Sequence, residues 1–137
     1  MPSPPVPAAI DEFLREAHPA VMATLREDGS PHSAATWYDW ENGELLLNVA
    51  ETRRRLAWMK PGAHVALTVL DKEDWYRHVS LSGRIARLVE DEGLRDIDRL
   101  SLRYFGKPYA TRDQRRLTGW MAVESWHAWD HGRLWAA

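Results

Sequence analysis

Apolar and polar positions alternate along most of this chain, and turn signals separate the alternating segments. The dipeptides Asp28-Gly29 and Asn42-Gly43 lie between three such segments, which predicts two consecutive β-hairpins. The pattern predicts strands at residues 20–25, 32–39, 44–49, 65–70, 76–88 and 120–129. Gly83 interrupts the longest alternating segment, so we expect a bulge there.

Three other segments favour helices. The first helix should begin near Ile10 and end before His18-Pro19, because a residue that precedes proline disfavours helical backbone. Thr52 is a candidate N-cap for a second helix, which would stop at Pro61-Gly62. The third helix is predicted over residues 91–105 and should end at the glycine that follows it.

Antiparallel hairpins with helices at their edges predict a mainly β fold, a small barrel with flanking helices. We expect six or so strands in one domain, residues 10–137. Residues 1–9 contain four prolines and are predicted to form a flexible arm.

Composition narrows the function classes. The formal net charge of −2 argues against a nucleic-acid partner, which would favour a basic surface. No apolar run approaches the roughly 20 residues of a membrane span, and there is no cysteine, so we expect a cytoplasmic protein without a membrane partner. The eight tryptophans indicate a core, an interface or a wall beside a flat ligand, and composition does not choose among these.

Three consecutive arginines, Arg53, Arg54 and Arg55, follow the third predicted strand. Positive charge at a helix start opposes the helix dipole, which favours a nearby anion such as a phosphate. Adjacent helical residues point about 100° apart, so we expect two of the arginines to face the anion and one to face solvent. The alternative interpretation is a solvated basic surface.

The order of these motifs resembles the split β-barrel flavin and deazaflavin oxidoreductases related to pyridoxamine 5′-phosphate oxidase, an FMN-binding-like fold. Within that family the chain is most similar to the small branch that binds the deazaflavin coenzyme F420. The resemblance rests on an ordered set of segments, among them Asp28-Gly-Ser-Pro-His, Thr36-Trp-Tyr-Asp, Thr52-Arg-Arg-Arg, Trp75-Tyr-Arg-His and Ser82-Gly-Arg.

The resemblance implies a homodimer with cofactor clefts at its interface, in which reduced F420 delivers a hydride to a small unsaturated or conjugated substrate. Arg53 and Arg55 would hold the cofactor phosphate, and Arg77 would contribute from the long strand. The remaining residues implied for cofactor binding lie along the ring: Thr36, Trp37, Tyr38, Asn48, Val49 and Ala50. The resemblance identifies no catalytic acid or base.

Two alternatives to F420 remain open: an FMN-dependent oxidoreductase, and a flavin- or haem-binding protein without turnover. Because F420 carries an acidic lactyl-glutamyl tail beyond its phosphate, basic residues in addition to Arg53 and Arg55 would favour it over FMN. We predict no metal site, since His127, Asp130 and His131 lack the spacing of known ligand motifs.

Overall fold

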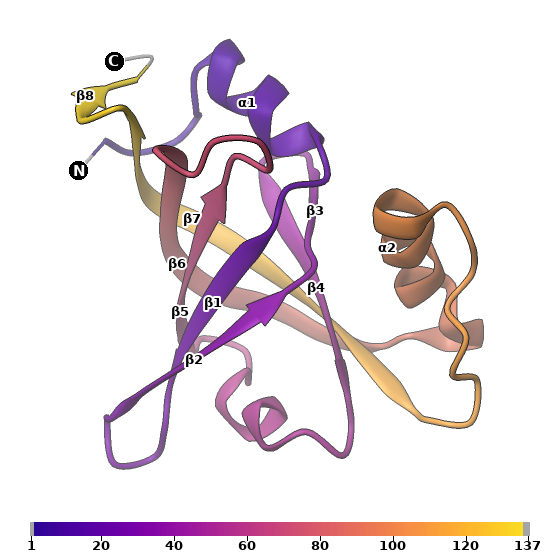
Figure 1. Ribbon diagram of the computed structural model, residues 1–137. Coiled ribbons are helices and arrows are strands. Elements are labelled where there is room, and N and C mark those ends of the chain that lie inside the picture. Colours follow the sequence, from indigo (N-terminus) through magenta and orange to yellow (C-terminus); the bar gives the residue numbers. More distant parts are fainter. Residues whose placement is uncertain (1, 136–137) are drawn as a thin grey trace.

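The computed structural model describes residues 2–135, which form one antiparallel sheet that curls into a barrel (Figure 1). The strands are β1 (Ala20–Leu25), β2 (Pro31–Thr36), β3 (Asp39–Glu41), β4 (Glu44–Ala50), β5 (His64–Leu70), β6 (Arg77–Glu90), β7 (Arg116–Asp130) and β8 (Arg133–Leu134). The helices are α1 (Ala8–Arg15), η1 (Arg54–Trp58), η2 (Glu92–Leu94) and α2 (Arg95–Phe105). The split β-barrel prediction is confirmed, with eight strands in place of six.

The strand order is β2-β1-β5-β6-β7-β4-β3, with β8 paired to β7. The two edge strands, β2 and β3, are consecutive in the chain and are joined by Trp37 and Tyr38. The single strand predicted over residues 32–39 is therefore wrong. Its first part pairs with β1 and its last residue pairs with β4, so the chain must cross from one edge of the sheet to the other at these two aromatic residues.

Inward-facing residues of the strands fill the barrel, and α1 packs its predicted apolar face against them. Ile10, Phe13 and Leu14 of α1 are buried in the same cluster as Leu47 and Leu81. Each fully buried side chain of this kind contributes about 1.5–3 kcal/mol relative to an exposed one. Figure 1 shows α1 across one end of the barrel and η1 at the opposite end.

The long strands β6 and β7 cross the whole molecule and contain the predicted bulge. Their pairing shifts register between Ser82 and Gly83 and again between Ile85 and Arg87. A β-carbon on Gly83 would collide with the carbonyl oxygen of Ala122 on β7. Glycine is required there because the two backbones approach too closely for any side chain.

The helix predicted from Thr52 is shorter than expected. It is a 3-10 helix whose N-cap is Arg53, and no side chain caps it. Met59, directly after it, is fully buried in the core and is the C-cap residue at which this short helix ends. The third helix also begins later than predicted, because Gly93 and Leu94 have positive φ and break the helical backbone. Gly106 ends it in the left-handed conformation, as predicted.

The segment predicted as an arm lies against β7 through its first residues. The backbone N–H of Trp126 donates to the Pro2 carbonyl oxygen at 3.0 Å, and its indole N–H donates to the Ser3 carbonyl oxygen at 3.3 Å. The flexibility of the arm stays a prediction. Neither α-helix within residues 2–135 has the length and apolar character that crossing a bilayer requires.

Candidate functional site

Two adjoining cavities lie where the sheet is split, between β2, β4, η1 and the chain that links α2 to β7. Their volumes are about 570 and 670 Å³. Five residues line both of them: Ala35, Arg53, Arg55, Tyr109 and Arg116. The two cavities therefore form one continuous site with two chemically different ends.

The first cavity is the aromatic cavity. Trp37, Tyr104, Tyr109, Ile97 and Leu100 supply its apolar wall. The rings of Trp37 and Tyr104 stack at 5.5 Å between centroids, and Tyr109 meets Trp37 edge-on at 6.0 Å. Large rings in these geometries form a rigid, flat surface suited to a planar ligand.

The second cavity is the arginine cavity. Arg53, Arg54, Arg55 and Arg116 line it, and no carboxylate does. Within residues 2–135 none of these four guanidinium groups forms an ion pair, although most other arginines in that range do. A cavity with this lining favours an anion.

Arg55 shows the excess of positive charge in this cavity most clearly. Its Nε is buried and has no hydrogen-bond partner in the described part of the chain. Burial lowers the pKa of this guanidinium, and the charges of Arg53 and Arg116 lower it further. Arg55 as a whole is half-buried, but a buried N–H donor without a partner is costly, so a phosphate oxygen at this position would relieve the cost. The residues present therefore fit a phosphate-bearing cofactor.

Arg116 is held from within the protein. Its Nε donates to Asn48 Oδ1 at 2.6 Å, and its guanidinium lies over the Tyr109 ring at 5.1 Å. The Asn48 amide in turn donates to Asp91 at 3.0 Å and to Thr118 at 3.2 Å. These contacts place the Arg116 side chain at the boundary between the two cavities.

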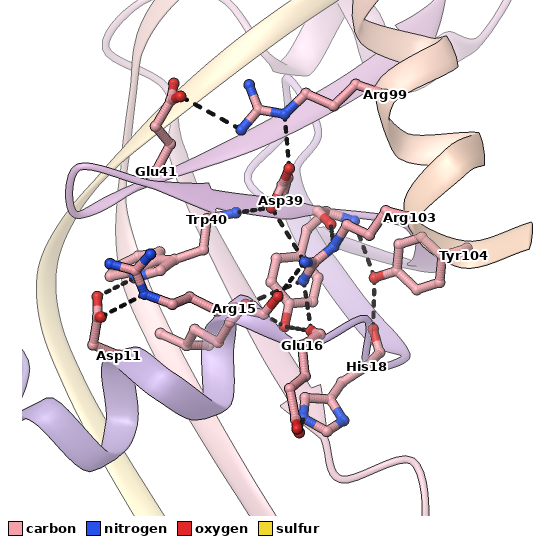
Figure 2. A network of polar contacts seen from close by, with 12 residues as sticks. Asp11, Arg15, Glu16, His18, Asp39, Trp40, Glu41, Arg99, Arg103 and Tyr104 are labelled. Carbon is pink, nitrogen blue, oxygen red and sulfur yellow. Dashed lines mark hydrogen bonds and ion pairs between the residues drawn. The ribbon is translucent and has the colours of Figure 1, made fainter. Parts of the chain in front are cut away.

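The end of α2 that carries Tyr104 is tied to the barrel by a polar network (Figure 2). Arg103 donates to the Tyr38 carbonyl oxygen at 2.9 Å, and to three carbonyl oxygens at the end of α1, those of Leu14, Arg15 and Glu16. The Tyr104 hydroxyl donates to the His18 carbonyl oxygen at 2.6 Å. Burial raises the pKa of Tyr104, so the ring is a neutral wall of the aromatic cavity.

Six of the nine residues predicted to bind cofactor line the cavities. Thr36, Trp37, Asn48, Arg53 and Arg55 line the aromatic cavity, and Ala50 lines the arginine cavity, which Arg53 and Arg55 also line. Their role in binding stays a prediction.

The other three predicted residues line neither cavity. Tyr38 and Val49 are fully buried, and the Tyr38 hydroxyl donates to carbonyl oxygens at the end of α1. Both side chains face the core, and a contact of these two residues with the ring through their backbone stays a prediction. Arg77 lies over the Trp135 ring at 4.2 Å, away from both cavities of its own chain.

Sequence reasoning missed Arg116, Tyr104 and Tyr109. Arg116 follows Arg115 at the start of the last long strand, much as Arg53–Arg55 follow β4. This second basic cluster beside a strand could have indicated that Arg116 belongs to the site. The sequence gives no such indication for the two tyrosines, because only the tertiary fold brings α2 and its following loop to the split of the barrel. Within residues 2–135 no three metal-ligating side chains come together.

Solved structures of low sequence identity share this fold. One described as an F420 reductase is 23% identical with a TM-score of 0.78, and the match covers 88% of this chain and 98% of the other. A conserved hypothetical protein of Mycobacterium tuberculosis is 24% identical with a TM-score of 0.73, over 94% of this chain and 87% of the other. An FAD and heme binding protein of Mycobacterium smegmatis is 19% identical with a TM-score of 0.66, over 94% and 73%.

A search among curated proteins finds no match. The family model of pyridoxamine 5′-phosphate oxidase matches residues 6–130, which include both cavities and every strand except β8. The residues implied by the sequence resemblance and the fold thus lead to one assignment. This chain belongs to the pyridoxamine 5′-phosphate oxidase family.

Proposed function

We propose that this protein is an F420-dependent oxidoreductase that transfers a hydride between reduced deazaflavin and a small unsaturated or conjugated substrate. One observation carries the proposal: four guanidinium groups without carboxylate partners line a cavity that opens into an aromatic one. A cofactor with a flat ring at one end and several negative charges at the other matches both ends of this site.

The number of arginines favours F420 over FMN. FMN ends in a single phosphate, which Arg53 and Arg55 would be sufficient to bind. F420 carries an acidic tail beyond its phosphate, and Arg54 and Arg116 supply the additional positive charge that such a tail needs. Guanidinium groups suit this role because each can offer paired N–H donors to a carboxylate or phosphate.

The bound deazaflavin supplies the hydride chemistry, and the protein supplies binding, orientation and a cavity that excludes water. Arg53 and Arg55 would hold the phosphate, while Trp37 and Tyr104 would form a flat wall for the ring or the substrate.

We further propose that the protein acts as a cytoplasmic homodimer and that Arg77 contributes across the subunit interface. Sedimentation at twice the 15.8 kDa mass of one chain would support the dimer, and a monomer would contradict it.

A flavin- or haem-binding protein without turnover is the second candidate. It is favoured by the lining of the aromatic cavity, which contains no carboxylate or histidine. Of the two tyrosines in this lining, Tyr104 already donates its hydroxyl to the His18 carbonyl oxygen. A cavity lining without a carboxylate or histidine suits a binding protein as well as an enzyme whose substrate takes its proton from water.

Parallel titrations with oxidised F420, FMN and haem, followed by tryptophan fluorescence, would test these functions. We expect F420 to bind at least tenfold more tightly than FMN. The variant Arg55→Ala should weaken F420 binding about 10–100-fold, the loss expected for a charge-assisted hydrogen bond to phosphate. Arg84→Ala is the matched control, because Arg84 is an exposed arginine paired with Glu124 outside both cavities.

The outcomes separate the candidates. Tighter binding of FMN would move the protein to the FMN-dependent alternative, and tight binding of F420 without turnover of conjugated substrates would favour the binding protein. Equal losses for Arg55→Ala and Arg84→Ala would contradict the role of the arginine cavity, because the effect would then be one of overall charge alone.

A further inference from the structure

A chain of buried polar groups connects the N-terminal end of α2 to the arginine cavity. Its members are Asp91, Asn48 and Arg116, which come from the turn before α2, from β4 and from the start of β7. All three are at least nine-tenths buried. Most polar groups at such depth are hydrogen-bonded, and here each one bonds to the next.

Asp91 contacts both the helix and the chain of polar groups. Its carboxylate accepts the backbone N–H groups of Asp96 at 2.7 Å and Ile97 at 2.9 Å, so it satisfies two of the free donors at the start of α2. One of its oxygens also accepts an Asn48 N–H at 3.0 Å. The same carboxylate therefore holds the helix and orients the Asn48 amide.

Asn48 connects an anion to a cation, because its amide carries both N–H donors and a carbonyl acceptor. Its NH₂ group donates to Asp91 and to the Thr118 hydroxyl, and its carbonyl oxygen accepts from Arg116. A carboxylate there would repel Asp91, and an apolar side chain would bind neither neighbour. Since both N–H donors are engaged, the amide plane is set and the oxygen must face Arg116.

Arg116 completes the chain at the cavity. Its Nε is used by Asn48, whereas no described residue accepts a hydrogen bond from its two Nη nitrogens. Both Nη groups remain available to a ligand in a cavity that Arg116 lines. Tyr109 beneath the guanidinium restricts its plane.

We propose that Asp91 is a positioning residue for anion binding, acting on Arg116 through Asn48. The side-chain relay Asp91–Asn48–Arg116 orients the two Nη groups toward the arginine cavity. This inference extends the proposed function, since both place an anionic group of the ligand beside Arg116. Because α2 forms one wall of the aromatic cavity, the relay also links the anchoring of this helix to the arginine cavity.

Calorimetric titration of the full chain with inorganic phosphate and with pyrophosphate tests the relay without any cofactor. We expect Asp91→Asn to weaken pyrophosphate binding about tenfold, the lower end of the loss seen when an outer hydrogen-bond partner is removed at metal sites. Asn48→Leu should produce a similar loss. It breaks the relay in its middle while Asp91 still caps α2, so it reports on the relay if Asp91→Asn fails to fold.

A double-mutant cycle separates positioning from general loss of structure. If Asp91 acts through Arg116, the variant Asp91→Asn/Arg116→Ala should bind pyrophosphate no more weakly than Arg116→Ala alone. Leu102→Gly is the matched control. It weakens α2 at an exposed position that lines neither cavity, and it should leave pyrophosphate affinity within twofold of the unmodified protein.

The possible failures are distinguishable. Additive losses in the cycle, unchanged affinity in Asp91→Asn, or an equal loss in Leu102→Gly would overturn the relay while the unmodified protein still binds pyrophosphate and the proposed function stands. If the unmodified protein binds neither phosphate nor pyrophosphate, the arginine cavity is not an anion site, and the relay and the proposed phosphate contacts both fail.

Discussion

Arg55 places a positive charge where no carboxylate among residues 2–135 forms an ion pair with it. Its Nε is buried and unsatisfied, and its charged neighbours are Arg53 and Arg116. At this scale the sequence was informative. Three arginines after a strand predicted an anion, and the structure shows a cavity of positive charge at that place. The adjacency of the three arginines did not predict that Arg55 is the one that is partly buried.

We expect Arg55→Ala to leave the ligand-free protein as stable as the unmodified one, or to stabilise it by up to about 1 kcal/mol. The substitution removes a desolvated cation and its repulsion from two neighbouring arginines, while the lost packing acts in the opposite direction. Chemical denaturation without ligand measures this. A loss of more than about 2 kcal/mol would mean that Arg55 has a structural partner after all.

A second prediction at residue scale concerns Gly83. Gly83→Ala should destabilise the protein by at least about 2 kcal/mol, because the new β-carbon meets the backbone of β7, which cannot move aside. Gly119→Ala is the matched control: its nearest neighbour is the flexible end of Met59, at 3.2 Å. Denaturation midpoints of the two variants compare them directly, and an equal cost for both would refute the close approach at Gly83.

At the scale of elements, hydrophobic alternation and turn dipeptides located the strands well, because both act over a few neighbouring residues. The predicted element boundaries are wrong where contacts with residues far apart in the sequence determine the structure. The segment 32–39 alternates throughout, yet it divides between β2 and β3 because β1 and β4 each take one part of it. Likewise, Thr52 has the chemistry of an N-cap, but the observed 3-10 helix begins after Arg53 and ends at Met59, whose side chain is buried in the core.

The anchoring of α2 supports a prediction at this scale. Arg103→Ala should lower stability by about 2–4 kcal/mol, because one guanidinium satisfies four backbone carbonyls and lies 3.3 Å from the Asp39 carboxylate. Hydrogen exchange of α2 amides should increase more than that of β5 and β6 amides. Leu102→Gly is the comparison, because it weakens α2 but leaves the Arg103 contacts in place. Uniform exchange changes across the barrel would contradict a local anchor.

At the scale of the whole molecule, the buried His18 makes stability depend on pH. Burial lowers the pKa of His18, against the opposing influence of the Glu16 and Asp71 carboxylates. As the pH falls below the usual histidine value of about 6.5, the unfolded chain is protonated first. The contribution of His18 is therefore present above that value and is lost as the pH falls through the folded-state pKa.

We expect His18→Asn to flatten the loss of stability on acidification from about pH 7 to 5, measured by denaturation at several pH values. His131→Asn is the opposite control. The exposed His131 lies beside Asp130 and Asp74, which raise its pKa, so its contribution is present at low pH and is lost as the pH rises through that pKa. If the stability of His18→Asn falls with pH as steeply as that of the unmodified protein, a group other than His18 causes the pH dependence.

The sequence alone predicts most of the strands, the two hairpin turns, the bulge at Gly83 and the arginines beside β4, but not the division of residues 32–39 between β2 and β3. All of these follow from periodicity, backbone freedom and charge within short segments. Only the tertiary structure decided that Tyr38 and Val49 face the core, that Arg77 lies away from the cavities of its own chain, and that Tyr104, Tyr109 and Arg116 complete the site. The physical reason is that a cavity is built from side chains far apart in sequence, and the closing of the sheet at its split brings them together.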